Sequence, residues 1–380
     1  MCVRRAEVFL IPGFFGFQTI AGLPYFHGVE PVLRAACAAQ RIEAQVHALD
    51  TLPTASLEQR ARYLAERIRE RVADDETPIH LVGHSTGGLD AQVLVSPSLP
   101  DLDGGLRERV ASLVSVSTPH QGTPLAEYFV KLEGQKLLRL LGLLSVHGLR
   151  YAGRPLVTTV SLGKLVSRID ELILLRESAL DQLAVLLADP LSAERLRPLE
   201  TFFDAVRADQ SLLHQLRPAA MTGFADRVRP SPTVRYASVL TRARPPRLRG
   251  TVEIGLRPIA QITHLIYQGL YRLCARQDPR SFPAPDSEQT RALVERYGKV
   301  PDSRANDGFV PTRSMVDAQV IHVGRGDHHD VIGYFDDGDH DPPHIDWVAT
   351  GSGFRRPHFE ALWGDVAAFM AHASQHRAAG

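Results

Sequence analysis

The chain of 380 residues is poor in cysteine and has no net charge. Its three cysteines, Cys2, Cys37 and Cys274, are too few for a disulfide framework and too far apart for a metal-ligand spacing, so we interpret them as free thiols. Lysine plus arginine and aspartate plus glutamate each number 43, so no net field attracts nucleic acid. We therefore expect no nucleic-acid partner.

The sequence also lacks long apolar runs. No window reaches 18 uncharged apolar residues, since even the leucine-rich stretch Leu137 to Val146 contains Arg139. At the N-terminus, Glu7 and then Pro12-Gly13 interrupt the apolar residues before any hydrophobic core of a signal peptide forms. We expect no transmembrane segment and a cytoplasmic location, with export by a route without a signal peptide left open.

Short apolar runs alternate with amphipathic stretches between residues 7 and 122, a pattern typical of βαβ units and a mostly parallel sheet. Apolar residues at helical spacing predict a helix over Leu57 to Val72, and further helices are expected near Glu288 to Tyr297 and Phe359 to Ala373. The predicted strands are Val8 to Ile11, Ala44 to Leu49, Ile79 to Val82, Ser112 to Val116, Arg235 to Leu240 and Val320 to Val323.

Residues 125–217 break this pattern, because they contain many leucines and little strand signal. Leucine spacing alone would equally suit further core helices, but the position in the chain favours an inserted helical cap or lid. We therefore divide the chain into a core domain, residues 1–124 and 218–380, and a helical insertion, residues 125–217.

The stretch Gly83 to Gly88 reads G-H-S-T-G-G and directly follows the predicted strand that ends at Val82. A serine between glycines at a strand-to-helix turn is typical of a nucleophile elbow, in which the glycines relieve crowding and Ser85 stays exposed. The alternative is a glycine-rich turn with an inert serine. The elbow hypothesis therefore requires a base, an acid and an oxyanion hole elsewhere in the chain.

Candidates for all three occur in the expected order. A serine nucleophile needs a histidine base held by a carboxylate. Asp307 lies in the turn Asn306 to Pro311, and His328 follows the last predicted strand, with the adjacent His329 as the alternative base. The backbone N–H groups of Thr86, after the serine, and of Phe14, after the first strand, would form the oxyanion hole. A dinucleotide site is disfavoured at this first loop because G-x-G-x-x-G spacing is absent.

Five ordered motifs together resemble the bacterial triacylglycerol lipase family of the α/β-hydrolase superfamily. They are F-L-I-P-G-F-F-G from Phe9, G-H-S-T-G-G from Gly83, S-T-P-H-Q-G-T from Ser117, N-D-G-F-V-P from Asn306 and D-H-H-D from Asp327. The resemblance covers roughly residues 7–335. It implies an α/β-hydrolase fold with a mostly parallel central sheet flanked by helices, the triad Ser85, Asp307 and His328, the oxyanion donors Phe14 and Thr86, and a mobile helical lid.

Two departures from the family affect what can be carried over. Pro12 stands where the family has the histidine of a His-Gly pair, which leaves the backbone donor in place. Asp330 matches one ligand of the family's structural calcium site, but the upstream acidic ligand has no clear counterpart, so Asp330 and calcium stay open and no cofactor is required. For the tract D-D-G-D-H-D-P-P-H from Asp336, a solvated turn is favoured over a metal site.

We therefore expect a serine carboxylic-ester hydrolase, a lipase or esterase, that cleaves small-molecule or lipid-like acyl esters through an acyl-enzyme. Phe15, Phe17 and His84 are predicted to contact the substrate, and transient contact with a lipid interface is compatible with the sequence. The alternatives are an acyltransferase, thioesterase or amidase with the same triad and, less favoured, a non-catalytic binding protein with this fold. Chain length of the acyl group and oligomeric state do not follow from the sequence.

Overall fold

The computed structural model describes residues 4–14, 16, 19–20, 23–72, 76–99, 105–131, 193–246, 258–338, 344 and 346–379. Within these residues the centre of the molecule is a six-stranded sheet in the order β4-β1-β5-β6-β7-β8, and every neighbouring pair is parallel. The strands are β1 (Arg4–Ile11), β4 (Ile42–Ala48), β5 (Ile79–His84), β6 (Val110–Val116), β7 (Arg235–Arg242) and β8 (Gln319–Arg325). A two-stranded antiparallel ribbon, β2 (Thr19–Ile20) with β3 (Leu23–Pro24), lies outside this sheet.

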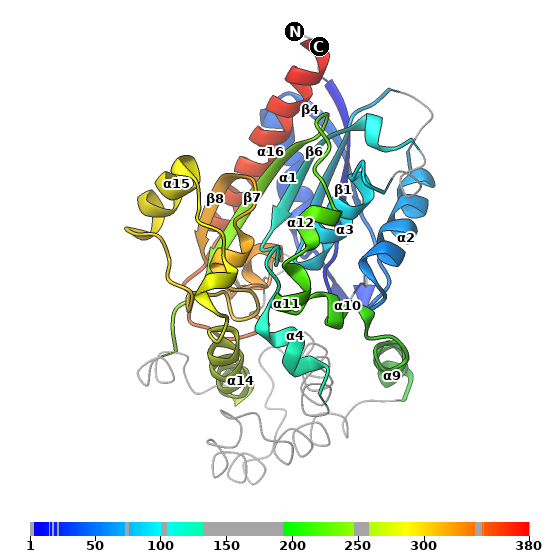
Figure 1. Ribbon diagram of the computed structural model, residues 1–380. Coiled ribbons are helices and arrows are strands. Elements are labelled where there is room, and N and C mark those ends of the chain that lie inside the picture. Colours follow the sequence, from blue (N-terminus) through cyan, green and yellow to red (C-terminus); the bar gives the residue numbers. More distant parts are fainter. Residues whose placement is uncertain are drawn as a thin grey trace.

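Helices cover both faces of the sheet (Figure 1). The helices α1 (Val29–Ala39) and α16 (Arg356–Ala379) pack together, as do α2 (Leu57–Arg69) and α3 (Thr86–Val95). The side chains of β1 divide between the two resulting cores, because successive residues of a strand point to opposite faces. Val8 and Leu10 join the core with α1 and α16, whereas Phe9 and Ile11 join the core with α2 and α3.

The six strands predicted from the sequence are all present, with ends displaced by at most a few residues. The predicted surface helix is α2, and the later predicted helices are α15 (Ser287–Tyr297) and α16. Sequence analysis did not identify α1 or the buried helix α14 (Pro258–Cys274). The remaining short helical turns are η2 (Arg107–Arg109), η3 (Pro279–Ser281), η4 (Thr312–Met315) and η5 (Asp330–Ile332).

The predicted cap is described only at its two ends, since residues 132–192 lie outside the described part. Those ends are helical, as expected: α4 (Pro124–Phe129) begins the segment, and α9 (Ala193–Ala208) and α10 (Ser211–Gln215) end it. The short helices α11 (Pro218–Met221) and α12 (Phe224–Arg227) lead back to β7. The division into core and cap stays a prediction. Among the described helices, none is long and apolar enough to cross a membrane.

Candidate active site

Ser85 lies at the sharp turn between β5 and α3 with φ of 55° and ψ of −127°. A positive φ is rare for a residue with a side chain and marks backbone strain, which surrounding contacts must hold in place. One such contact is the Ser85 N–H, which donates to the Val116 carbonyl on the adjacent strand at 2.8 Å. The serine therefore has the strained strand-to-helix geometry expected of a nucleophile elbow.

The flanking glycines are required by close backbone approach. A Cβ atom at Gly83 would lie 2.3 Å from the Gly88 nitrogen, and one at Gly87 would lie 2.4 Å from the Ile11 carbonyl oxygen. Neither contact is tolerable for any side chain. The crowding predicted from the sequence is thus present, and it arises because α3 begins directly beside the ends of β1 and β5.

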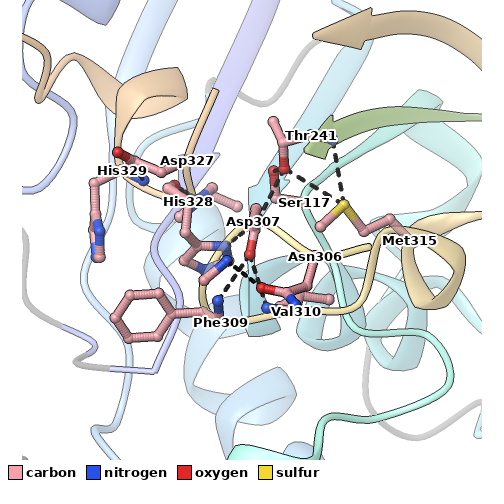
Figure 2. A network of polar contacts seen from close by, with 12 residues as sticks. Ser117, Thr241, Asn306, Asp307, Phe309, Val310, Met315, Asp327, His328 and His329 are labelled. Carbon is pink, nitrogen blue, oxygen red and sulfur yellow. Dashed lines mark hydrogen bonds and ion pairs between the residues drawn. The ribbon is translucent and has the colours of Figure 1, made fainter. Parts of the chain in front are cut away.

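The acid and the base predicted from the sequence are in direct contact (Figure 2). The Asp307 carboxylate is fully buried, and its Oδ2 accepts a hydrogen bond from His328 Nδ1 at 2.7 Å. The backbone N–H of His328 also donates to the Asp307 carbonyl at 3.1 Å. Because Nδ1 carries the proton given to Asp307, Nε2 of a neutral His328 is left as the basic nitrogen.

Three further donors hold the Asp307 carboxylate. The backbone N–H groups of Phe309 and Val310 donate to Oδ1 at 3.0 and 2.8 Å. The hydroxyl of Thr241, at the end of β7, donates to Oδ2 at 2.9 Å and in turn accepts from Ser117 at 2.8 Å. Figure 2 shows these contacts around Asp307, next to His328. Four donors fix the orientation of this carboxylate in a buried site.

The loop that carries His328 is fixed by a second buried carboxylate. Asp327 Oδ1 accepts from the backbone N–H groups of His329 and Asp330 at 2.8 and 3.0 Å, and Oδ2 accepts from the Thr350 hydroxyl at 2.8 Å. Burial raises the Asp327 pKa to about 6 despite these donors. Asp327 thus closes a turn around the base without contacting its ring.

Ser85 and His328 line one cleft, which has a cavity volume of about 70 Å³. Phe14 and Thr86, the predicted oxyanion donors, line the same cleft. Thr86 is the first residue of α3, where backbone N–H groups have no acceptor within the helix. Much of the remaining wall is apolar and comes from the described ends of the predicted cap: Leu125, Ala126, Phe129, Leu213 and Leu216.

A buried ion pair stands behind the oxyanion side of the cleft. Arg60 and Asp90 are both fully buried, and the guanidinium meets the carboxylate through Nε at 2.9 Å and Nη2 at 2.7 Å. Arg60 Nη2 also donates to the Gly13 carbonyl at 3.1 Å. In a trans peptide the carbonyl and the next N–H point in opposite directions, so this contact directs the Phe14 N–H away from Arg60.

Tyr25 and His84 connect the two sides of the cleft. The Gly13 N–H donates to the Tyr25 hydroxyl at 2.9 Å, so the Tyr25 proton is donated to His84 Nδ1 at 2.8 Å. His84 Nε2 then donates to the His328 carbonyl at 2.9 Å. Burial, with His328 and His329 nearby, lowers the His84 pKa well below its usual value, in keeping with this neutral tautomer.

This arrangement corrects the role predicted for His84. The sequence suggested a substrate contact, but the side chain is buried, does not line the cleft and has both ring nitrogens engaged by protein atoms. We assign it to positioning the loops of Gly13 and His328. The other two predicted substrate contacts, Phe15 and Phe17, lie outside the described residues.

Calcium binding at Asp330, which the family resemblance left open, stays a prediction. Asp330 Oδ2 accepts the Asp327 N–H at 2.8 Å, and burial beside Asp327 raises the Asp330 pKa well above its usual value. Within the part of the chain that the structure covers, no group of three or more His, Cys, Asp or Glu side chains is arranged to hold a metal ion.

Several positioning residues carry no local signal in the sequence. Thr241 ends an ordinary strand, Arg60 reads as one of the charged positions of a surface helix, and Tyr25 follows no motif. Ser117 and Asp327 do lie inside two of the family motifs, although the motifs assign neither of them a role. Each becomes visible only when the sheet order brings distant strand ends together.

No known protein-family model matches the chain. Curated relatives do match part of it. A triacylglycerol lipase of Vibrio cholerae is 33% identical over 124 residues, which are 32% of this chain and 35% of that protein. A triacylglycerol lipase of Pseudomonas fragi is 32% identical over 126 residues, or 32% of this chain and 38% of that protein. The chain thus matches little more than a third of the length of these relatives, and over that part the resemblance predicted from the motifs is confirmed.

Two solved structures match nearly the whole chain. EstA from Clostridium botulinum has a TM-score of 0.53 at 17% identity and covers 98% of this chain and 88% of its own. Lipase 1 from Pelosinus fermentans has a TM-score of 0.53 at 15% identity, and the match covers 98% of this chain and 99% of that lipase. The fold is that of an α/β hydrolase. In this fold the elbow, the acid and the base all lie at the carboxyl ends of parallel strands, where such sheets place their sites.

Proposed function

We propose that the protein is a serine carboxylic-ester hydrolase, a lipase or esterase, with Ser85 as nucleophile, His328 as base and Asp307 as the acid that holds the base. One observation carries the proposal. Ser85, with its strained backbone, lines the same cleft as His328, and His328 Nδ1 is hydrogen-bonded to the fully buried Asp307 carboxylate. That combination activates a hydroxyl that is otherwise a weak nucleophile.

The reaction would proceed in two halves. Ser85 Oγ attacks the ester carbonyl while His328 Nε2 takes its proton, and Asp307 stabilises the imidazolium that forms. The N–H groups of Phe14 and Thr86 bind the oxyanion. When the intermediate collapses, the bond to the alcohol breaks and His328 returns the proton to the leaving oxygen. Water then attacks the acyl-serine with His328 again as base, which releases the carboxylic acid and restores Ser85.

The apolar cleft supports an acyl ester with a hydrocarbon chain as the substrate. Leucine, alanine and phenylalanine side chains from α4 and α10 line it beside Ser85, so burial of methylene groups would contribute about 0.8 kcal/mol each. The relatives from Vibrio and Pseudomonas are named for triacylglycerol, which is an ester of this kind. We infer a lipid-like acyl ester as the substrate class, with transient contact at a lipid surface.

Replacement of the nucleophile tests the proposal. Ser85→Ala should reduce kcat for p-nitrophenyl acyl esters by about 10⁵- to 10⁶-fold, since serine and histidine act as a unit in such sites. It should also abolish covalent labelling by a fluorophosphonate probe. Ser98→Ala, an exposed position just beyond α3, is the matched control and should keep both properties. Undiminished turnover and labelling of Ser85→Ala would contradict the proposal.

A further inference from the structure

His329, beside the base, is an unpaired polar group in the wall of the cleft. Its side chain lines the cleft and is 5% exposed. Nδ1 is fully buried and has no hydrogen-bond partner, whereas Nε2 keeps accessible surface and likewise makes no hydrogen bond within the described chain. Figure 2 shows the ring beside Phe309, without any contact of the kind that His328 makes. A buried polar group left unpaired is costly and calls for an explanation.

Most of the other polar side chains of the cleft have partners within the protein or a role in the proposed reaction. The Tyr25 hydroxyl is bound between Gly13 and His84, and the Thr123 hydroxyl donates to the Phe309 carbonyl. His328 is bound to Asp307, Ser85 is the nucleophile, and the Thr86 hydroxyl lies 3.5 Å from an Arg60 nitrogen. His329 thus offers the cleft a polar atom that no protein group uses and that takes no part in the proposed hydrolysis.

The position of His329 places it near the alcohol half of a bound ester. Because His328 must return a proton to the leaving alcohol, that oxygen has to come within hydrogen-bond reach of His328 Nε2. The His329 ring stands perpendicular to that of His328, with 5.6 Å between centroids. The apolar wall from α4 and α10 offers hydrocarbon contacts to the acyl half. We therefore expect the polar atom of His329, next to the base His328, to face the substituents of the alcohol beyond its ester oxygen.

The surroundings hold this ring in a fixed, neutral state. The Phe309 ring is perpendicular to the His329 ring, with 4.9 Å between the ring centroids. The Trp347 ring centroid lies 4.2 Å from that of His329. Burial, together with nearby His328, lowers the His329 pKa well below its usual value. A neutral imidazole presents either a donor or an acceptor at Nε2, and a hydroxyl group can satisfy both.

We propose that His329 selects esters whose alcohol carries a free hydroxyl close to the ester oxygen, as in partial esters of polyols, over esters of simple alkanols. The inference rests on the proposed ester hydrolysis and names the substrate class for that same site. A hydroxyl two carbons from the ester oxygen fills the unpaired position on His329. An alkyl group of equal size leaves the imidazole unpaired in the complex, which disfavours that complex.

A pair of substrates with equal size tests the selection. We would measure kcat/KM for 2-hydroxyethyl hexanoate and propyl hexanoate, each divided by its rate of alkaline hydrolysis, in the unaltered protein and in two variants. The unaltered protein should favour the hydroxyethyl ester by roughly tenfold, the value of one neutral hydrogen bond with a protein partner otherwise left unpaired. In His329→Leu the ratio should fall to about one, and His329→Gln should restore part of it.

The ratio of the two kcat/KM values distinguishes a role of His329 in substrate selection from a purely structural role. A merely structural role would lower both rates together and leave their ratio unchanged in His329→Leu, which would overturn the inference. A ratio near one in the unaltered protein would overturn it equally. If neither ester, nor any p-nitrophenyl ester, is hydrolysed by the folded protein, the proposed function itself fails. Melting temperatures of both variants identify any that do not fold, and His329→Gln then supplies the comparison.

Discussion

The two sides of the cleft each rest on a fully buried carboxylate, and the two carboxylates are held differently. On the oxyanion side Asp90 faces Arg60, whose charge is permanent. On the base side Asp307 faces His328, which is neutral or charged according to its proton, and three uncharged donors. The Arg60–Asp90 pair can only position the groups around it. The Asp307–His328 pair can also stabilise the charge that forms when His328 takes up a proton, so only this second pair can take part in catalysis.

The difference extends to what each carboxylate orients. Asp90 fixes a guanidinium whose remaining N–H groups bind the Leu52, Pro53 and Gly13 carbonyls, so its effect reaches the oxyanion loop through the backbone. Burial raises the Asp90 pKa, against the opposing effect of Arg60. Asp307 fixes one imidazole tautomer directly. Disrupting the Asp307 contact should therefore mainly lower kcat, whereas disrupting the Arg60–Asp90 pair should mainly lower the free energy of unfolding.

The largest effect is expected from Asp307→Asn. The amide would present a donor or a weak acceptor to His328 Nδ1, which favours the wrong tautomer and removes the charge that stabilises the imidazolium. We expect kcat for p-nitrophenyl esters to fall by about 10⁴-fold, as in other serine triads. Steady-state kinetics measures this loss, and circular dichroism should show a folded protein. A loss below tenfold in the folded variant would indicate that another group holds the base.

A stability effect should dominate on the oxyanion side. Arg60→Met leaves Asp90 buried without its cation, and removing one partner of a buried pair costs about 3–5 kcal/mol in the free energy of unfolding. Asp90→Asn leaves the permanent charge of Arg60 without its anion and should also lower stability, although the amide oxygen can still accept from the guanidinium. Urea denaturation measures both values.

Turnover at a temperature where both variants are folded sharpens the contrast. Arg60→Met also frees the Gly13 carbonyl, so kcat should fall in this variant more than in Asp90→Asn. Equal kcat values in the two variants would show that the ion pair does not position the oxyanion loop, although it still stabilises the fold.

The elements that sequence analysis predicted are those with a strong local pattern. The strands are short apolar runs, and the elbow is dictated by Gly83 and Gly87, where backbone approaches backbone. Asp307 and His328 were found because each follows a strand in a known order. The helix α14 was missed although its apolar residues recur at helical spacing, because its polar face is almost uncharged, with Arg272 as its one charged residue.

The positioning residues could not have been found in the same way. Arg60 occupies a helix with the composition of a surface helix, yet it is fully buried because Asp90 and three carbonyls surround its guanidinium. His84 was predicted to contact the substrate, and only the fold shows that Tyr25 and the His328 carbonyl occupy both of its ring nitrogens. Such roles depend on contacts between residues distant in sequence.

The smallest effect concerns His84, which joins the two sides of the cleft as a buried neutral group. Its pKa is lowered in the folded protein, so below about pH 6.5 the unfolded chain binds a proton at this residue that the folded chain does not. Stability from His84 is therefore complete above pH 6.5 and is lost as the pH falls. One proton corresponds to at most about 1.4 kcal/mol per pH unit in the free energy of unfolding.

His84→Gln removes this titration while its amide can still reach both neighbours. Asp327 acts in the opposite direction, because with a pKa raised to about 6 the folded protein holds a proton that the unfolded chain has released. Asp327 is present in both proteins, so the difference between their slopes isolates His84. Urea denaturation between pH 5.5 and 7 should show the variant losing stability less steeply as the pH falls. Parallel slopes would mean that His84 takes up its proton equally in both states, and then it could not be the neutral link between the oxyanion loop and the base.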